Sequence, residues 1–215
     1  STKISATLKD MSANEFKEFN NEVLGYLQQN NLENMISEPS SFRVIFTYMV
    51  EAIVNSLLYG LFIGILLITL IIGLFFRSYL LPALSIFPNI LPIGMGFGLW
   101  GLFVGDVGFM VAVGMGSTLG VIVDFTVHFL SKYELARKEF KKSVEESVIY
   151  SFETVGFALI IMTVVLALGF SVLNLVTFIP IQDFAKFSVI CFIGGLIINF
   201  LFLPNLLIKF DKRKF

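Results

Sequence analysis

Five long apolar stretches constrain the fold of this chain more than any other feature. Residues 53–76, 79–104, 154–182 and 187–208 contain no Asp, Glu, Lys or Arg, and residues 107–130 contain only Asp124. A helix needs about 20 apolar residues to cross the hydrocarbon core of a bilayer. We therefore predict an all-α polytopic membrane protein with five spans. The predicted spans cover residues 50–76, 80–104, 107–130, 151–178 and 186–208.

The composition agrees with this class and excludes others. Hydrophobic residues make up 56% of the 215 residues and charged residues 14%, against about 25% charged in soluble domains. The net charge of −1 provides no electrostatic attraction to nucleic acid. The single cysteine, Cys191, lies in an apolar run and is predicted to be a small core residue. No residue spacing predicts a metal or a cofactor.

The first 40 residues are polar and of mixed character, and they differ from the rest. Their pattern predicts a strand at 3–9, a helix with a capping box from Ser12 to Glu15, and a strand at 31–37. So short an α/β unit rarely buries enough surface to be stable alone. Residues 1–40 therefore either dock on another part of the protein or belong to a domain whose remainder is missing here, and we expect a transmembrane domain at 41–211 after them.

Basic residues predict the orientation in the membrane. They gather in the loop 131–142, at the C-terminus 209–214 and at Arg77, whereas the alternate loops contain only Lys186. With five spans, the three basic sites share one side, which the positive-inside rule places in the cytoplasm, with the N-terminal segment outside. Residues 132–148 also show an apolar stripe, which predicts an amphipathic helix on the inner membrane surface.

The third span carries a polar stripe. Ser117, Gly120, Asp124 and His128 recur at steps of three or four, so they share one helix face, and Gly116 completes a GxxxG with Gly120. Small residues allow a second helix to approach closely, so we expect this stripe to face a neighbouring helix. A charged Asp at mid-membrane costs about 2.5–3.5 kcal/mol, and such residues usually carry function.

Asp124 is therefore the main candidate for a proton relay. The alternative is a neutral, hydrogen-bonded structural Asp. His128 is either its relay partner or a side chain that reaches the headgroup zone. Two other polar residues lie at a compatible depth, Asn199 and Thr163. Each is either a hydrogen-bond partner of Asp124 or, as favoured for Thr163, bonded to its own backbone.

Four sequence motifs in this order resemble the membrane half of the resistance-nodulation-division (RND) superfamily, in particular its MMPL-type exporters. They are FFRSYLLPALSIFPNILPIG, GVIVDFTVHFLSKYELARK, TVGFALIIMTVVLALGF and LFLPNLL. The resemblance covers about residues 53–209. It implies a five-helix RND half, expected to be the C-terminal one, preceded by the end of a porter domain.

The resemblance also implies a function and partners. Relatives use the proton-motive force to export hydrophobic or amphiphilic compounds such as lipids, across the cell inner (plasma) membrane, as dimers or trimers. The expected partners are the bilayer, the other RND half, the rest of the porter domain and the substrate. Asp124 occupies the position of the family's relay acid, but many relatives have Tyr or Asp where this chain has Phe125.

Two alternatives to a transporter remain from the sequence. Sterol-sensing domains are five-helix units of the same kind, so a lipid-binding or regulatory module with a structural Asp124 is the second hypothesis. An enzyme is not expected, because no catalytic carboxylate pair, nucleophile triad or phosphate loop is present. The run GMGSTLG lies inside a span, where glycines favour helix packing over nucleotide binding.

Overall fold

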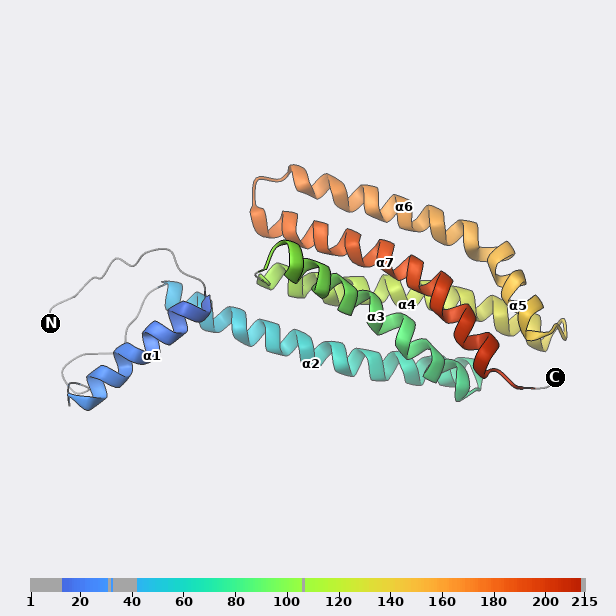
Figure 1. Ribbon diagram of the computed structural model, residues 1–215, viewed down its shortest axis with the longest axis horizontal. Helices are drawn as coiled ribbons and strands as arrows, with labels where there is room; N and C mark the ends of the chain where they lie inside the picture. Colours follow the sequence, from blue (N-terminus) through green and yellow to red (C-terminus); the bar gives the residue numbers. More distant parts are fainter. Residues whose placement is uncertain (1–12, 31, 33–41, 106, 214–215) are drawn as a thin grey trace. The chain divides into compact units, whose positions relative to one another are not determined.

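The protein is helical throughout the part that the computed structural model describes, residues 13–30, 32, 42–105 and 107–213. No strand occurs among these residues, and Figure 1 shows the order of the helices along the chain. The helices are α1 (Ala13–Gln29), α2 (Phe42–Phe76), α3 (Leu80–Phe103), α4 (Phe109–Lys138), α5 (Val144–Ser151), α6 (Phe157–Val172) and α7 (Ile179–Phe210). A π-helical turn, Phe152–Gly156, joins α5 to α6, and a 3-10 turn, Leu173–Leu175, follows α6.

Five helical segments in the described residues are long and apolar enough to cross a membrane. They are Thr47–Phe76, Leu80–Phe103, Phe109–Lys138, Val144–Leu175 and Ile179–Phe210. Each overlaps one predicted span, so the chain is a multi-pass membrane protein with an all-α membrane region. The strands predicted at 3–9 and 31–37 fall, apart from Leu32, outside the described residues. The described residues of 1–40 form helix α1 and no strand, so the α/β character of this segment is not supported.

The chain forms two compact units, Ser1–Ile53 and Val54–Phe215. In the first unit, α1 and the start of α2 are joined by polar contacts. Lys17 forms an ion pair with Glu51, and the Asn20 amide donates to the Tyr48 hydroxyl at 3.4 Å. The second unit contains the rest of α2 and all of the later helices, and it contains the candidate site.

Short turns with left-handed backbone end α2 and α3. Arg77 (φ 49°) reverses the chain between α2 and α3. Gly105 (φ 91°) ends α3, and its N–H donates to the Trp100 carbonyl at 3.2 Å. A glycine adopts this conformation without steric cost. Inside α3, Pro88 and Pro92 remove backbone donors, yet the helix continues to Phe103.

The predicted amphipathic helix at 132–148 is divided between two elements. Residues up to Lys138 continue α4, and the chain then turns at Lys141, which has φ 53°. Helix α5 restarts after Ser143, whose hydroxyl accepts from the Glu146 N–H while the Glu146 carboxylate accepts from the Ser143 N–H. This capping box satisfies two backbone donors at once and fixes the break in a segment whose apolar periodicity alone predicted continuity.

Helix α7 is the centre of the second unit, because it packs against α3, α4 and α6. Close approach to α7 depends on particular glycines. A Cβ on Gly96 of α3 would lie 2.6 Å from the Cys191 sulfur, and one on Gly195 of α7 would lie 3.0 Å from Ile122 of α4. Cys191 is fully buried, as expected of a core residue. Small residues thus allow α3 and α4 to pack tightly on α7.

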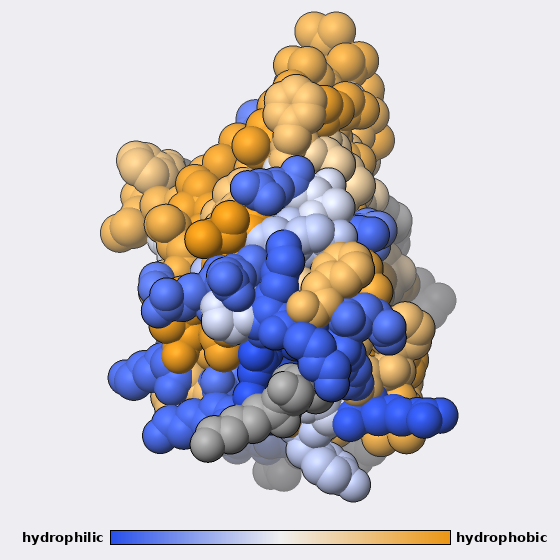
Figure 2. Space-filling model, turned by 90° about the vertical axis from the view of Figure 1, so that its right-hand side faces the viewer, coloured by the Kyte–Doolittle hydropathy of each residue, from blue (hydrophilic) through white to orange (hydrophobic). Residues whose placement is uncertain are grey.

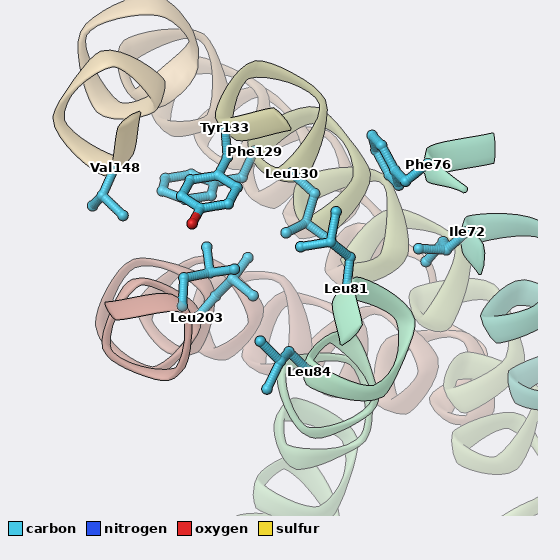
Figure 3. Close-up of a cluster of buried hydrophobic side chains, with 10 residues drawn as sticks. Ile72, Phe76, Leu81, Leu84, Phe129, Leu130, Tyr133, Val148 and Leu203 are labelled. Carbon is cyan, nitrogen blue, oxygen red and sulfur yellow. The ribbon is translucent and has the colours of Figure 1, made fainter. Parts of the chain in front are cut away.

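At the end of the unit near the C-terminus, an apolar cluster joins α2, α3, α4, α5 and α7. Figure 3 shows Phe129 and Tyr133 of α4 beside Val148 of α5 and Leu203 of α7, with the Tyr133 hydroxyl directed toward α7. Phe129, Tyr133 and Leu203 are fully buried. The turn at Lys141 brings α5 back onto α4 and makes this packing possible.

Candidate functional site

Asp124 and His128 lie together on the outer face of α4. The carboxylate Oδ1 is 3.4 Å from the imidazole Nε2, and the side chains are 50% and 56% exposed, respectively. Asp124 is close to the middle of α4, two helical turns before Lys132. The two side chains are therefore in contact within one helix, as the relay-partner alternative for His128 requires. No other described acidic or basic side chain forms an ion pair with either of them.

The expectation that this stripe faces a neighbouring helix is wrong within this chain. Ser117, Gly116 and Gly120 are exposed. A Cβ added at Gly116 or Gly120 would meet no atom within 4 Å. The opposite face of α4 is the one that packs, since Ile122 and Phe125 are fully buried against other helices. Sequence spacing showed correctly that the polar residues share a face, but it could not show which face the bundle buries.

Phe125, the residue that departs from the family pattern, belongs to that buried face. It clusters with Val155 of the π-helical turn and Leu159 of α6. Its ring therefore points into the bundle, away from the stripe that carries Asp124 and His128. On the described part of the chain, any proton chemistry on the outer face of α4 rests on these two side chains.

The buried side of α4 contains a second polar group that sequence reasoning missed. The Thr126 hydroxyl lies 2.7 Å from Asn89 Oδ1 of α3 and 2.8 Å from Asn199 Oδ1 of α7. Because a hydroxyl has one proton, it donates to one amide at a time. Asn199 also donates from Nδ2 to the Gly195 carbonyl at 3.0 Å. All three side chains are buried, so they join three helices through a polar contact in the apolar core.

The hydrogen bonds show which partners Asn199 and Thr163 have. Asn199 makes an interhelical contact, but with Thr126 and not with Asp124. Thr163 donates to the Leu159 carbonyl of its own helix at 2.9 Å, which confirms the backbone interpretation. The sequence signal for Asn89 was its position between two prolines inside an apolar run, where a polar side chain needs a partner.

A buried ionic cluster lies at the end of the second unit near the C-terminus, which we call the basic end. The Arg213 guanidinium donates to both carboxylate oxygens of Glu134, at 3.0 and 2.9 Å. It also donates to both carboxylate oxygens of Asp211, at 2.9 and 2.8 Å. The Tyr133 hydroxyl donates to Asp211 at 2.6 Å. Helix α4 is thereby tied to the residues that follow α7.

These contacts set the protonation of Asp211. Burial acts to raise the pKa of its carboxyl group, but the hydrogen bonds from Arg213 and Tyr133 outweigh it and lower the pKa to about 2. Hydrogen bonds to the charged form always act in this direction. Asp211 is therefore ionised at any pH near neutrality, and it is a structural anion, unlike a group that exchanges protons.

Two further basic residues of α4 complete this end. Arg137 donates to the Lys142 carbonyl at 2.7 Å and to the Arg213 carbonyl. Lys138 forms an ion pair at 2.9 Å with Glu134, one helical turn before it, and donates to the Phe76 carbonyl at the end of α2. Figure 2 shows hydrophilic residues over this end of the unit, with apolar residues around them. The pattern fits a helix bundle whose polar end leaves the membrane.

The described residues hold no group of three or more His, Cys, Asp or Glu placed to bind a metal ion. Comparison with protein-family models found no match. Comparison with curated proteins likewise found none. The resemblance to RND transporters therefore stays a prediction from the four sequence motifs, and the geometry of α4 is the independent observation beside it.

Proposed function

We propose that this chain is the five-helix membrane half of a proton-driven transporter of the RND superfamily, of the MMPL type, with Asp124 as its proton carrier. The observation that carries this proposal is the Asp124–His128 pair on the outer face of α4, midway along a helix long enough to span a membrane. Five apolar helices in the order of the RND half, and the four sequence motifs, support it.

The position of the pair demands a partner. A carboxylate that faced lipid at this depth would cost about 2.5–3.5 kcal/mol, and such residues almost always face another helix or a water-filled cavity. The glycines at 116 and 120 leave a smooth face on which a second bundle can pack closely. In an RND transporter the second half covers this face, and the pair then lies at the interface of the two halves.

A chemical cycle follows from this placement. Protonation of Asp124 removes its charge and weakens its attraction to His128 and to any cation of the second half. Loss of the proton restores the charge of Asp124 and these attractions. Two protonation states thus favour two arrangements of the halves, which is what coupling to alternating conformations requires. His128 contacts Asp124 directly, so it is placed to pass a proton toward the basic end of the bundle.

Export, orientation and assembly complete the proposal. The basic end, with Arg77, the α4–α5 turn and the residues after α7, lies in the cytoplasm, and residues 1–40 lie outside as part of a porter domain. The transporter sits in the cell inner (plasma) membrane and assembles as a dimer or trimer. Its substrates are hydrophobic or amphiphilic compounds such as lipids.

The test is made on the intact parent protein in lipid vesicles. We expect Asp124→Asn to abolish transport driven by a proton gradient, and to remove an infrared carboxyl band that appears and disappears as the pH is stepped. Asp183→Asn is the matched control, because Asp183 pairs with Lys186 at the other end of the bundle. Gradient-driven transport that survives Asp124→Asn would refute the proposal and favour a lipid-binding module of the sterol-sensing kind.

A further inference from the structure

A cavity of about 400 Å³ lies at the end of the second unit opposite the basic cluster. It is lined by the last turns of α3, the end of α6 with the 3-10 turn after it, and the first turns of α7. Its walls are mainly apolar, and include Leu99, Trp100 and Phe103 of α3 and Val189 of α7. Its size and its apolar, partly aromatic lining are those of small-molecule sites, which add a few polar groups to fix a ligand.

Three polar side chains lie in this lining, those of Ser171, Asn174 and Lys186. The Ser171 hydroxyl donates to the Ala167 carbonyl of its own helix at 2.6 Å. Lys186 is the only Lys or Arg between residues 143 and 208, and it lines the cavity with its side chain 50% exposed. Its ammonium group is 3.8 Å from the Asp183 carboxylate, which is longer than a hydrogen bond. An ammonium group has three donors, so Lys186 can bind an anionic oxygen at the cavity while it stays near Asp183.

Asn174 supplies a complementary group. Its Nδ2 donates to the Ser171 carbonyl at 3.1 Å, whereas its Oδ1 is buried and has no hydrogen-bond partner among the described residues. A buried acceptor without a partner destabilises the folded state. Asn174 lines the cavity, so a ligand that brings a hydroxyl group beside its anionic oxygen would place that hydroxyl next to Asn174 while it pairs with Lys186.

We propose that this cavity binds an anionic phospholipid, with one acyl chain against Trp100 and Phe103, its phosphate at Lys186 and a headgroup hydroxyl at Asn174. A lysine near the membrane surface attracts anionic lipid headgroups. A phosphatidylglycerol has all three parts. The proposal does not rest on proton transport, because it uses neither α4 nor Asp124.

Trp100 is the only tryptophan of the chain, so it reports on this site without labelling. The purified protein is placed in mixed vesicles of phosphatidylglycerol and phosphatidylcholine, and only one of the two lipids has brominated acyl chains. Bromine quenches tryptophan fluorescence at short range. At equal brominated fraction, we expect brominated phosphatidylglycerol to quench Trp100 more strongly, with a relative association constant about fivefold higher, the ratio for one lysine near an anionic headgroup.

Three variants, one of them a control, test where the anionic headgroup is recognised. We expect Lys186→Gln to reduce the ratio to about one, whereas Lys209→Gln, which removes an exposed lysine at the other end of α7, leaves it unchanged. Val189→Phe should fill the cavity and reduce the quenching by phosphatidylglycerol to the level of phosphatidylcholine. Each variant is compared with itself in lipids without bromine.

Equal quenching of the unmodified protein by the two lipids would overturn the proposal and show a groove filled by bulk lipid. This comparison needs no variant, so it holds even if Lys186→Gln fails to fold. A preference that persists in a folded Lys186→Gln protein would also overturn it, because the headgroup would then be recognised elsewhere.

Discussion

Arg213→Met is the substitution that most directly tests the ionic cluster at the basic end. Arg213 makes four side-chain hydrogen bonds to two carboxylates, those of Glu134 and Asp211. The side chains of these two acids are only 5% and 0% exposed. Methionine keeps much of the volume of the arginine stem but leaves both charges without their main partner. The folded state then loses stability because two buried anions are no longer neutralised.

The expected magnitude follows from the geometry. Removal of one partner from a buried ion pair costs about 3–5 kcal/mol. Arg213 is 24% exposed, and Lys138 remains 2.9 Å from Glu134, so part of the compensation persists. We therefore expect a loss of about 3 kcal/mol in the free energy of unfolding, at the low end of that range.

The measurement is denaturant unfolding of the purified protein in detergent, followed by circular dichroism and by Trp100 fluorescence. Lys212→Met is the matched control, because Lys212 is the exposed neighbour and forms no ion pair with the cluster among the described residues. We expect the control to lie within about 0.5 kcal/mol of the unmodified protein. An Arg213→Met protein equally close to the unmodified protein would refute the reasoning that the cluster holds α4 to the end of α7.

The pH dependence supplies a second readout of the same cluster. The pKa of Asp211 is lowered to about 2 in the folded protein, against about 3.9 in an unfolded chain. A lowered carboxyl pKa stabilises the folded state above the unfolded value, and this stabilisation is lost as the pH falls from about 4 toward 2. We expect that loss in the unmodified protein, and a smaller one in Arg213→Met. If Arg213→Met lost as much stability at acid pH as the unmodified protein, the pairing of Arg213 with Asp211 would be contradicted.

Two further substitutions test the packing of α7. Gly96→Ala should lower stability by about 1–3 kcal/mol, since its Cβ would lie 2.6 Å from the Cys191 sulfur. Gly94→Ala on the same helix is the control, because its Cβ meets nothing within 4 Å and should not lower stability. Equal stabilities of the two variants by thermal unfolding would contradict the close contact. Thr126→Val leaves two buried asparagines without their shared partner and should lower the free energy of unfolding by about 1–3 kcal/mol. Thr163→Val removes only a hydrogen bond to its own helix and should lower it less. Denaturant titration measures both variants, and equal losses would refute the three-helix contact.

Much of the membrane fold could be predicted because long apolar runs leave little choice. A run such as 187–208 can satisfy its backbone in a bilayer only as a helix, so its residues suffice to predict the element. The pairing of Asp124 with His128 was equally accessible, since four residues separate neighbours on one helix face. Such predictions depend on distances along a single helix, which the sequence contains directly.

The break after α4 shows where local patterns were insufficient. The apolar stripe of 132–148 predicted one helix, but the backbone turns at Lys141 and the capping box of Ser143 starts another. The capping box was readable as a motif, yet the periodicity ran across it without interruption. A helix ends where capping and packing favour an end, and the apolar periodicity alone indicates neither the capping nor the packing.

The sequence by itself determined the class of this protein, its five apolar helices and the alignment of Asp124 with the small residues of α4. Only the tertiary structure decided that this stripe lies outside the bundle, that Thr126 joins Asn89 and Asn199, and that Arg213 pairs with Glu134. The physical reason is the range of the interactions. Helix faces follow from neighbours three or four residues apart, whereas the choice of the face to bury depends on contacts between residues far apart in the chain.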